Sequence, residues 1–233
     1  MSDLLAIAPE VFALIPGLRV VVVVADELTA ARPQEADARW SAAWSRVHAS
    51  FGFANPQSHP HVQAWRVSMK GAGASHKEYP TSVEALVRRA LKSPQPFRIN
   101  PYVDFYNSVS LEHVVPAGGY DLDSLPGPLE LRLTRVGDSF QALDAATPEP
   151  VPAGELAYAC GSQVVTRHLV WRQSRLGLVT AETRSALFLS EVLPSHPDVA
   201  GPVQDALASG LRELFGARVE AVVLSADAPV LER

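Results

Sequence analysis

The sequence has almost no cysteine and fewer basic than acidic residues. Cys160 is the single cysteine among 233 residues, so no internal disulfide can form, and no cluster of histidine and cysteine has the spacing of metal ligands. These absences favour a reducing, cytoplasmic compartment and a protein without a metal or other cofactor. The formal net charge of −5 argues against non-specific coating of nucleic acid, because such binding needs lysine and arginine to neutralise phosphates.

The sequence also lacks an uninterrupted apolar run of membrane-spanning length. Residues 4–24 are rich in apolar side chains, but Pro9, Glu10, Pro16 and Arg19 interrupt them, and no basic segment or small-residue cleavage site accompanies them. We therefore expect neither a signal peptide nor a membrane span. With 47% hydrophobic and 19% charged residues, the composition is typical of a globular protein, and we predict a monomer with one domain over residues 1–233.

Patterns of apolar residues predict helices mixed with strands. Helical spacing, with Thr81 or Ser82 and then Asn100 as candidate caps, predicts helices over residues 33–51, 82–93, 101–112 and 202–215. Short β-branched or alternating runs predict strands over residues 19–25, 64–68, 129–133, 156–159, 164–165, 168–171, 186–189 and 219–224. This mixture indicates an α+β fold with a mixed or mainly antiparallel sheet and flanking helices.

Polar residues on the helix predicted over residues 101–112 form a first candidate site. Asp104 and Asn107 are three positions apart, so they share one helix face and could line a pocket. The alternative is that both side chains hydrogen-bond nearby loop backbone and only stabilise the fold. Tyr106, next to Asn107, is either a contact residue or part of the core.

A glycine pair after this helix forms a second candidate. Gly118 and Gly119 can adopt positive φ and bring backbone N–H groups close to a ligand, with Tyr120 and Asp121 following on a tight turn. Such a turn would suit recognition of a carbonyl or ribose oxygen. The alternative is an ordinary loop glycine pair before a structural tyrosine.

Residues 167–173, RHLVWRQ, are predicted to form one strand with polar groups on both faces. His168 is a candidate general base, although a lone histidine also occurs as a satisfied structural residue. Arg172 or Arg175 is a candidate contact for a tRNA phosphate, and the alternative is a solvated charge. Cys160 is expected to be a small buried residue rather than a nucleophile.

Glu191 follows an otherwise apolar run and would point to the same side of a strand as Leu187 and Leu189. A carboxylate in such a place needs a partner. If the pocket receives a guanidinium-like ligand, Glu191, Asp104 or Asp121 would be its partner, because two carboxylate oxygens match the fork of a guanidinium group. The alternative is that Glu191 lies at an exposed strand end.

Six short segments occur in order within residues 77–193: YPTSVEALVRR (79–89), NPYVDFYN (100–107), PAGGYDLD (116–123), GE (154–155), RHLVWRQ (167–173) and VTAET (179–183). Together they resemble the freestanding B3/B4-domain proteins, relatives of the editing module in the bacterial phenylalanyl-tRNA synthetase β subunit. No segment is specific alone, and their shared order carries the resemblance. The sequence departs from the synthetase module at Gly118 and Gly119, which stand where that module has a histidine before an aromatic-Asp turn.

The resemblance implies an α+β fold and hydrolysis of the ester that joins a wrong amino acid to the acceptor end of tRNA. The synthetase module removes mischarged tyrosine, and the family includes deacylases for tRNA(Arg) that carries canavanine, an arginine analogue. The candidate residues would then divide into an ester-holding and water-orienting set, Asn107, His168, Gly118 and Gly119, an amino-acid-binding set, Asp104, Tyr106, Tyr120, Asp121 and Glu191, and a tRNA-binding set, Arg88, Arg89 and Arg172.

An acidic pocket would favour canavanyl-tRNA(Arg) over tyrosyl-tRNA(Phe). Two other classes of function stay open on the sequence. One is a non-catalytic, tRNA-binding or synthetase-associated module that uses a basic patch of Arg88, Arg89, Lys92 and Arg98. The other is a small-molecule hydrolase or amino-acid-binding protein that does not use tRNA.

Overall fold

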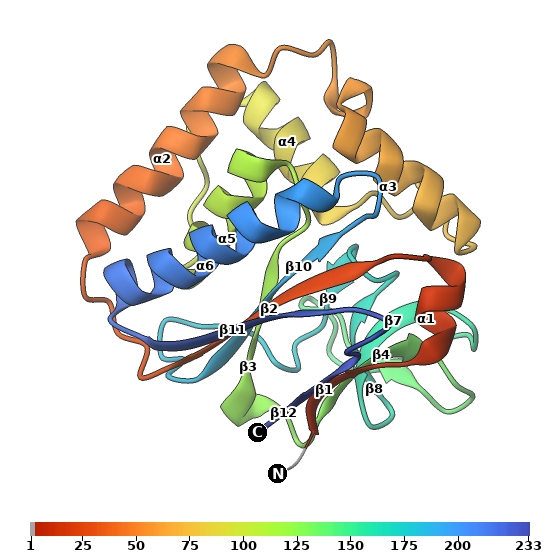
Figure 1. The fold of residues 1–233 in the computed structure, drawn as a ribbon. Coiled ribbons are helices and arrows are strands. Elements are labelled where there is room, and N and C mark those ends of the chain that lie inside the picture. Colours follow the sequence, from red (N-terminus) through yellow and green to blue (C-terminus); the bar gives the residue numbers. More distant parts are fainter. Residues whose placement is uncertain (1–2) are drawn as a thin grey trace.

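Strand β2 (Arg19–Asp26) lies at the centre of three layers in the computed structural model, which describes residues 3–233 (Figure 1). One face of β2, carrying Val22, packs between two sheets, and the opposite face, carrying Val23, packs beneath helices. This double burial explains the run of five consecutive valines from residue 20 to residue 24. The strand predicted over residues 19–25 is confirmed.

The inner sheet has four antiparallel strands in the order β11-β2-β10-β3. Its other strands are β11 (Arg218–Leu224), β10 (Ala186–Val192) and β3 (Gly118–Asp121). Strand β10 pairs with β2 along its whole length, whereas β3 pairs with β10 only as far as Leu189. The end of β10 therefore extends beyond β3, with one edge unpaired by any strand.

The outer sheet has eight strands, in the order β12-β1-β4-β7-β8-β5-β6 with β9 paired to β8. Most pairs are antiparallel, but β1 with β4 and β5 with β8 are parallel. The bounds are β1 (Asp3–Ile7), β4 (Leu129–Leu133), β5 (Ser139–Phe140), β6 (Glu149–Pro150), β7 (Leu156–Cys160), β8 (Gln163–Arg167), β9 (Arg172–Gln173) and β12 (Val230–Glu232). The predicted α+β fold with mixed sheets is confirmed.

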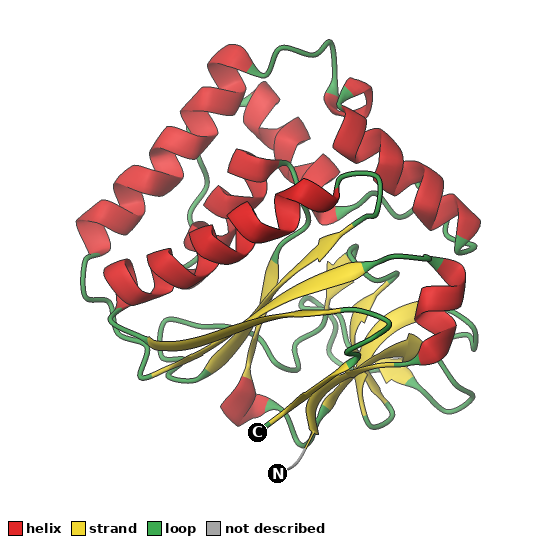
Figure 2. Ribbon diagram, in the orientation of Figure 1, coloured by secondary structure: helices red, strands yellow, loops and turns green. Residues whose placement is uncertain are grey.

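A layer of helices covers the inner sheet on the side away from the outer sheet (Figure 2). The four predicted helices are confirmed as α2 (Pro33–Ser50), α4 (Ser82–Lys92), α5 (Pro101–His113) and α6 (Ala200–Phe215). Both predicted caps form, because the Thr81 side chain accepts from the Glu84 N–H and the Asn100 side chain accepts from the N–H groups of Tyr102 and Val103. The remaining helical segments are α1 (Pro9–Leu14), α3 (Pro60–Gly71), η1 (Pro56–Ser58), η2 (Leu122–Ser124) and η3 (Pro197–Val199).

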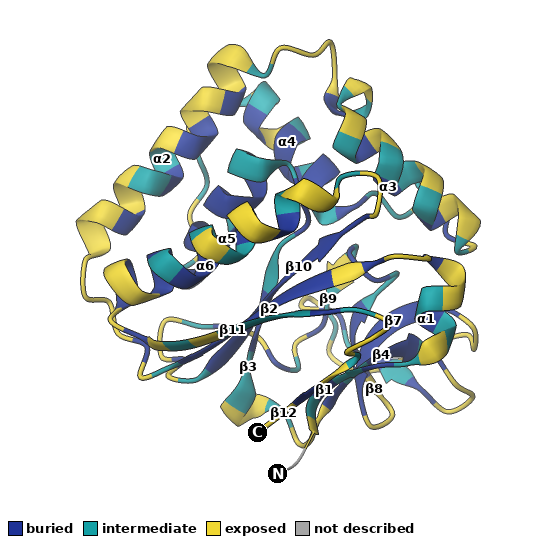
Figure 3. Ribbon diagram, in the orientation of Figure 1, coloured by how far each residue is buried: buried dark blue, intermediate teal, exposed yellow. Residues whose placement is uncertain are grey.

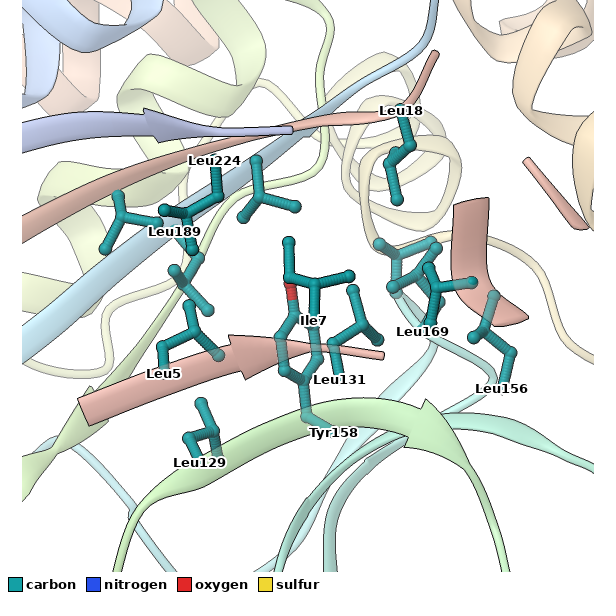
Figure 4. Packing of buried hydrophobic residues seen from close by; sticks show 14 of the residues in the cluster. Leu5, Ile7, Leu18, Leu129, Leu131, Leu156, Tyr158, Leu169, Leu189 and Leu224 are labelled. Carbon is teal, nitrogen blue, oxygen red and sulfur yellow. The ribbon is translucent and has the colours of Figure 1, made fainter. Parts of the chain in front are cut away.

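Apolar side chains from both sheets fill the space between them (Figure 4). Leu189 of the inner sheet and Leu131 of the outer sheet belong to one buried cluster, together with Tyr158. A second cluster lies between the inner sheet and helices α5 and α6. Burial follows these layers, since β2 and β10 are mostly dark and the outward faces of α2 and α6 are largely exposed in Figure 3. Among residues 3–233, no helix is long and apolar enough to cross a membrane.

The strand predicted over residues 64–68 is wrong, because these residues lie within helix α3. The short run of alternating apolar residues resembled a strand, but the buried residues of α3 are Val62, Trp65 and Met69, which follow helical spacing. The His59 side chain caps this helix by accepting from the His61 N–H, and Pro60 occupies its first turn. The helix is stabilised because it buries the face that carries Trp65.

The strand predicted over residues 168–171 is also wrong. Strand β8 ends at Arg167, and the chain then turns before the two residues of β9. His168 and Leu169 have φ values of 45° and 59°, in the left-handed region that non-glycine residues rarely occupy. Residues 168–171 are called the left-handed turn below.

Candidate functional site

A cavity of about 280 Å³ opens where β10 extends beyond β3. Its walls come from α4, α5, β3, the segment 169–173 and the end of β10. Helices α4 and α5 and strand β3 follow one another in the chain, and the fold brings the segment 169–173 and the end of β10 to them. The volume is near the lower end of the range for small-ligand sites.

Glu191 lies at the buried end of this cavity. Glu191 is 5% exposed, and its Oε1 accepts a hydrogen bond of 2.7 Å from the Tyr158 hydroxyl. Burial raises the pKa of Glu191 to about 7, while the bond from Tyr158 acts in the opposite direction. Glu191 points between the sheets, on the side of Leu187 and Leu189, as the alternation predicts. It is not at an exposed strand end.

Tyr106 and Tyr120 line the cavity together with Glu191. Tyr120 is buried, and its hydroxyl lies 2.6 Å from Thr166 Oγ1. Tyr106 is 8% exposed and lines the cavity from α5. Burial raises the pKa of both phenols, so both stay neutral at physiological pH. They supply hydroxyl groups without adding charge.

Gly118 and Gly119 line the cavity, but as residues of strand β3 rather than of a tight turn. Neither has positive φ, so the predicted conformation is wrong. Packing explains the second glycine, because a Cβ atom at Gly119 would lie 3.1 Å from the Phe188 ring. A Cβ at Gly118 would meet nothing within 4 Å.

The free edge of β3 presents backbone polar groups at Gly119. The Gly119 carbonyl accepts a hydrogen bond of 3.1 Å from Gln173 Nε2, on the side away from β10. A strand residue directs its N–H and C=O to the same edge, so the Gly119 N–H also lies on this free edge. Asn107, half-buried on α5, contributes an amide to the cavity wall.

Asp104 and Asp121 lie outside the cavity wall and stabilise loops. Asp104 accepts from the Ile99 N–H at 3.1 Å, and its other oxygen lies 3.7 Å from Arg98. Asp121 accepts from backbone N–H groups of η2 and from the Thr183 hydroxyl at 2.6 Å. The alternative interpretation of Asp104, a carboxylate that hydrogen-bonds loop backbone, therefore describes its contacts.

His168 is also outside the cavity wall. Its ring stacks on Tyr79, with 3.7 Å between the ring centroids, and burial lowers its pKa. Cys160 donates to the Gly127 carbonyl at 3.3 Å and is buried. Burial raises the pKa of this thiol, which disfavours the thiolate that a nucleophile needs.

The predicted tRNA-binding arginines separate into two groups. Arg89 and Arg172 line the cavity, where Arg89 lies over the Phe97 ring and Arg172 pairs with the exposed Asp144 at 2.7 Å. Arg88 instead pairs with buried Glu84 at 2.6 Å and does not line the cavity. Two positive groups therefore border the cavity.

Sequence reasoning missed several residues of the site. Tyr158, Thr166 and Gln173 contact Glu191, Tyr120 and Gly119 respectively, and Trp171 forms part of the wall. A signal for Tyr158 was present, since a tyrosine in the apolar strand LAYAC needs a partner for its hydroxyl when buried. Within residues 3–233, no group of three or more His, Cys, Asp or Glu side chains is arranged to hold a metal ion.

The model of the B3/4 domain family matches residues 64–197, which is more than half of the chain, and the chain belongs to this family. The matched region contains the whole cavity wall. No curated protein matches the sequence significantly.

The fold is similar to that of a solved protein structure. An N-terminal fragment of the phenylalanyl-tRNA synthetase β subunit from Pyrococcus horikoshii is similar, with a TM-score of 0.48 and 9% sequence identity. The match covers 95% of this chain and 54% of that chain, so the present chain spans about half the length of that structure. A likeness this distant says nothing about activity.

Proposed function

We propose that this protein is a hydrolase that removes a wrongly attached amino acid from tRNA. The observation that carries the proposal is a cavity with a buried carboxylate at its inner end, inside the region that matches the B3/4 domain. The resemblance of the sequence to freestanding B3/B4-domain proteins implies hydrolysis of an aminoacyl ester. The cavity volume of about 280 Å³ suits one amino-acid side chain and its ester.

The ester would lie along the free edge of β3. The Gly119 N–H is the proposed donor to the carbonyl oxygen, where negative charge develops when water adds to the carbonyl carbon. Asn107 is proposed to orient that water. The ester bond then breaks, the water-derived proton reaches the ribose oxygen, and free amino acid and uncharged tRNA are released. An aminoacyl ester is already reactive, so positioning and charge stabilisation are the main requirements.

The Glu191 carboxylate is proposed to bind the amino-acid side chain. It is buried, and its one side-chain donor among the described residues is the neutral hydroxyl of Tyr158. A cationic ligand would supply the charge partner that a buried carboxylate needs. A guanidinium-like group such as that of canavanine fits this requirement, because it can donate two parallel hydrogen bonds.

Arg89 and Arg172 are proposed to contact phosphates of the tRNA acceptor end. Both border the cavity, so a single strand whose last ribose carries the ester could lie between them. Arginine is suited to this task because its planar group binds phosphate through two N–H donors. Arg88 is given no such part, because it does not line the cavity and pairs with the buried Glu84.

The deciding experiment is release of amino acid from a panel of mischarged tRNAs, including canavanyl-tRNA(Arg) and tyrosyl-tRNA(Phe). We expect turnover of canavanyl-tRNA(Arg), and we expect no release above buffer from correctly charged tRNAs. No turnover of any substrate would overturn the enzyme assignment. Salt-dependent tRNA binding without hydrolysis would instead indicate the non-catalytic module.

The role of Glu191 is tested by Glu191→Gln, with Asp104→Asn as its matched control. Both changes remove one buried acid without changing its size, but only Glu191 lines the cavity. We expect Glu191→Gln to lower kcat/KM for canavanyl-tRNA by about 10-fold to 100-fold, which matches loss of one charged contact of about 1.5–3 kcal/mol. Equal effects of the two changes would contradict a contact between Glu191 and the substrate.

A further inference from the structure

The left-handed turn is an energetically unfavourable piece of backbone beside the cavity. His168 and Leu169 have consecutive positive φ values of 45° and 59°, and neither is glycine. A left-handed conformation brings the Cβ atom of an L-residue too close to the following carbonyl. Such conformations persist only where surrounding contacts hold them, and they occur preferentially at functional sites.

The carboxylate of Glu155 supplies the side-chain contacts at the start of this turn, beside backbone hydrogen bonds from the Leu169 N–H to Leu156 and from the Trp171 N–H to Arg167. Its Oε1 accepts from the His168 backbone N–H at 3.0 Å and from Arg167 Nε at 3.0 Å. Its Oε2 accepts from Arg167 Nη2 at 2.7 Å. The Glu155 side chain is 6% exposed, so these bonds are shielded from water. One buried side chain thus binds the end of β8 and the first residue of the turn.

The left-handed turn also supports the cavity wall. The Val170 carbonyl accepts from the Ser82 N–H at 2.8 Å, which connects the turn to the start of α4. Gln173, which follows the turn, donates to the Gly119 carbonyl on β3. Trp171 forms part of the wall itself and lies close to Tyr79, with 4.7 Å between ring centroids. A shift of the turn would therefore move three sides of the cavity.

We propose that Glu155 is a positioning residue, which holds the left-handed turn and thereby places Trp171 and Gln173 at the cavity. It does not line the cavity and touches no proposed substrate position. Its influence on the reaction rests on the proposed function, whereas its influence on the turn does not. Glu155 acts through its hydrogen bonds from the Arg167 side chain and from the His168 backbone N–H.

The test compares Glu155→Gln with Asp138→Asn. Asp138 is a matched control, because it is a buried carboxylate of the outer-sheet region that accepts from Arg132 at 2.7 Å and from the Arg135 N–H. Its hydrogen bonds do not reach the turn. Both variants are checked for native circular dichroism and are assayed at a temperature where both are folded.

We expect Glu155→Gln to lower kcat for mischarged tRNA by about 10-fold to 100-fold, as a small displacement of positioning groups does. The KM for tRNA should change less than kcat, because the phosphate contact of Arg89 is retained and only that of Arg172, which follows the turn, is disturbed. Asp138→Asn should leave both constants within about two-fold of the wild-type values. Equal losses of kcat in the two variants would overturn the proposal, since they would reflect general destabilisation.

Amide hydrogen exchange supplies a readout that does not depend on activity. Exchange within residues 167–173 should accelerate at least about 10-fold in Glu155→Gln and stay unchanged in Asp138→Asn. Unchanged exchange in Glu155→Gln would overturn the proposal. If the wild-type protein hydrolyses no mischarged tRNA, the proposed function fails, and the exchange data alone decide whether Glu155 holds the turn.

A glycine variant tests the strain directly. Glycine adopts positive φ without the Cβ conflict, so His168→Gly added to Glu155→Gln should slow exchange of residues 169–173 relative to the single variant. It should also recover at least about three-fold in kcat. A double variant with exchange and kcat no better than those of Glu155→Gln would contradict a role for Glu155 in holding this backbone.

Discussion

The charge of Glu191 is controlled by its surroundings. Burial removes water from the carboxylate, and the Tyr158 hydroxyl replaces only part of that hydration. The pKa therefore rises from 4.5 to about 7, so Glu191 is partly protonated at neutral pH. A cationic side chain in the cavity would lower this pKa again, so ligand binding and proton release are linked.

Glu191 should reduce stability at high pH. Its folded-state pKa of about 7 is higher than its unfolded value of 4.5, so its stabilising contribution as a protonated group is lost as pH rises between these values. Glu191→Gln should therefore be more stable than the wild type by up to about 3 kcal/mol at pH 8, from the pKa difference. The difference should vanish near pH 4. Urea unfolding of both proteins at about pH 4, 6 and 8 measures the difference in their free energies of unfolding. A difference that does not change with pH would contradict the prediction.

The two neighbouring glycines should respond differently to alanine. Gly119→Ala forces a Cβ atom to about 3.1 Å from the Phe188 ring and 3.3 Å from Val179, so we expect a loss of about 1–3 kcal/mol from overpacking. Gly118→Ala meets nothing within 4 Å and serves as the control, with a change below about 0.5 kcal/mol. Urea unfolding measures both, and equal losses would refute the packing argument.

Helix α5 positions one wall of the cavity, and its start is fixed by one side chain. Asn100 accepts from the N–H groups of Tyr102 and Val103, and its amide donates to the Val179 carbonyl at 3.0 Å. This residue thus joins the helix to the segment that leads into β10. The same helix brings Tyr106 and Asn107 to the cavity while Asp104 stays with the preceding loop.

Loss of the Asn100 cap should destabilise the protein. Asn100→Ala removes the acceptor for two helix N–H groups and the bond to Val179, so we expect a loss of about 1–2 kcal/mol. Asn100→Asp keeps the acceptor oxygens and loses only the amide donor, so it should retain part of this energy. Chemical unfolding of the three proteins measures the order, and an aspartate variant less stable than the alanine variant would contradict a capping role.

Across the whole molecule, histidines and Glu191 give opposite pH dependences. Burial lowers the pKa of His59 to about 4, helped by His61 and His196, and burial also lowers the pKa values of His113 and His196. These groups are neutral in the folded protein over a range where they are charged after unfolding. Their contribution to stability is therefore lost as pH falls below about 6.5, and for His59 the loss extends to about pH 4.

His59→Asn should weaken this acid sensitivity. Asparagine keeps a side-chain acceptor for the His61 N–H, which His59 supplies at the start of α3, while it removes the titrating group. The variant and the wild type should be similarly stable at pH 8, and the variant should be the more stable of the two at pH 5, midway through the range. Thermal unfolding at both values checks this, and parallel losses on acidification would contradict it.

The elements with strong local signals were predictable from the sequence. The valine run of β2, the apolar stripe of α2 and the caps of α4 and α5 all formed as predicted, because these signals act between residues close in the chain. Family membership was equally readable, since it depends on ordered short segments. Helix α3 and the left-handed turn were missed, because their conformations depend on burial and on the distant Glu155.

The sequence by itself determined which residues form the central strand and the main helices, and it placed Glu191 on the same strand face as Leu187 and Leu189. Tertiary structure alone decided which polar residues share the cavity. It brought Asn107, Gly119, Gln173 and Glu191 to the cavity, with Tyr158 bonded to Glu191. It placed Asp104, Asp121 and His168 outside the cavity wall, where they contact neighbouring loops or Tyr79. The physical reason is that strand alternation and helix periodicity are local, whereas the shortness of β3 beside β10 and the contacts of Glu155 join residues far apart in the chain.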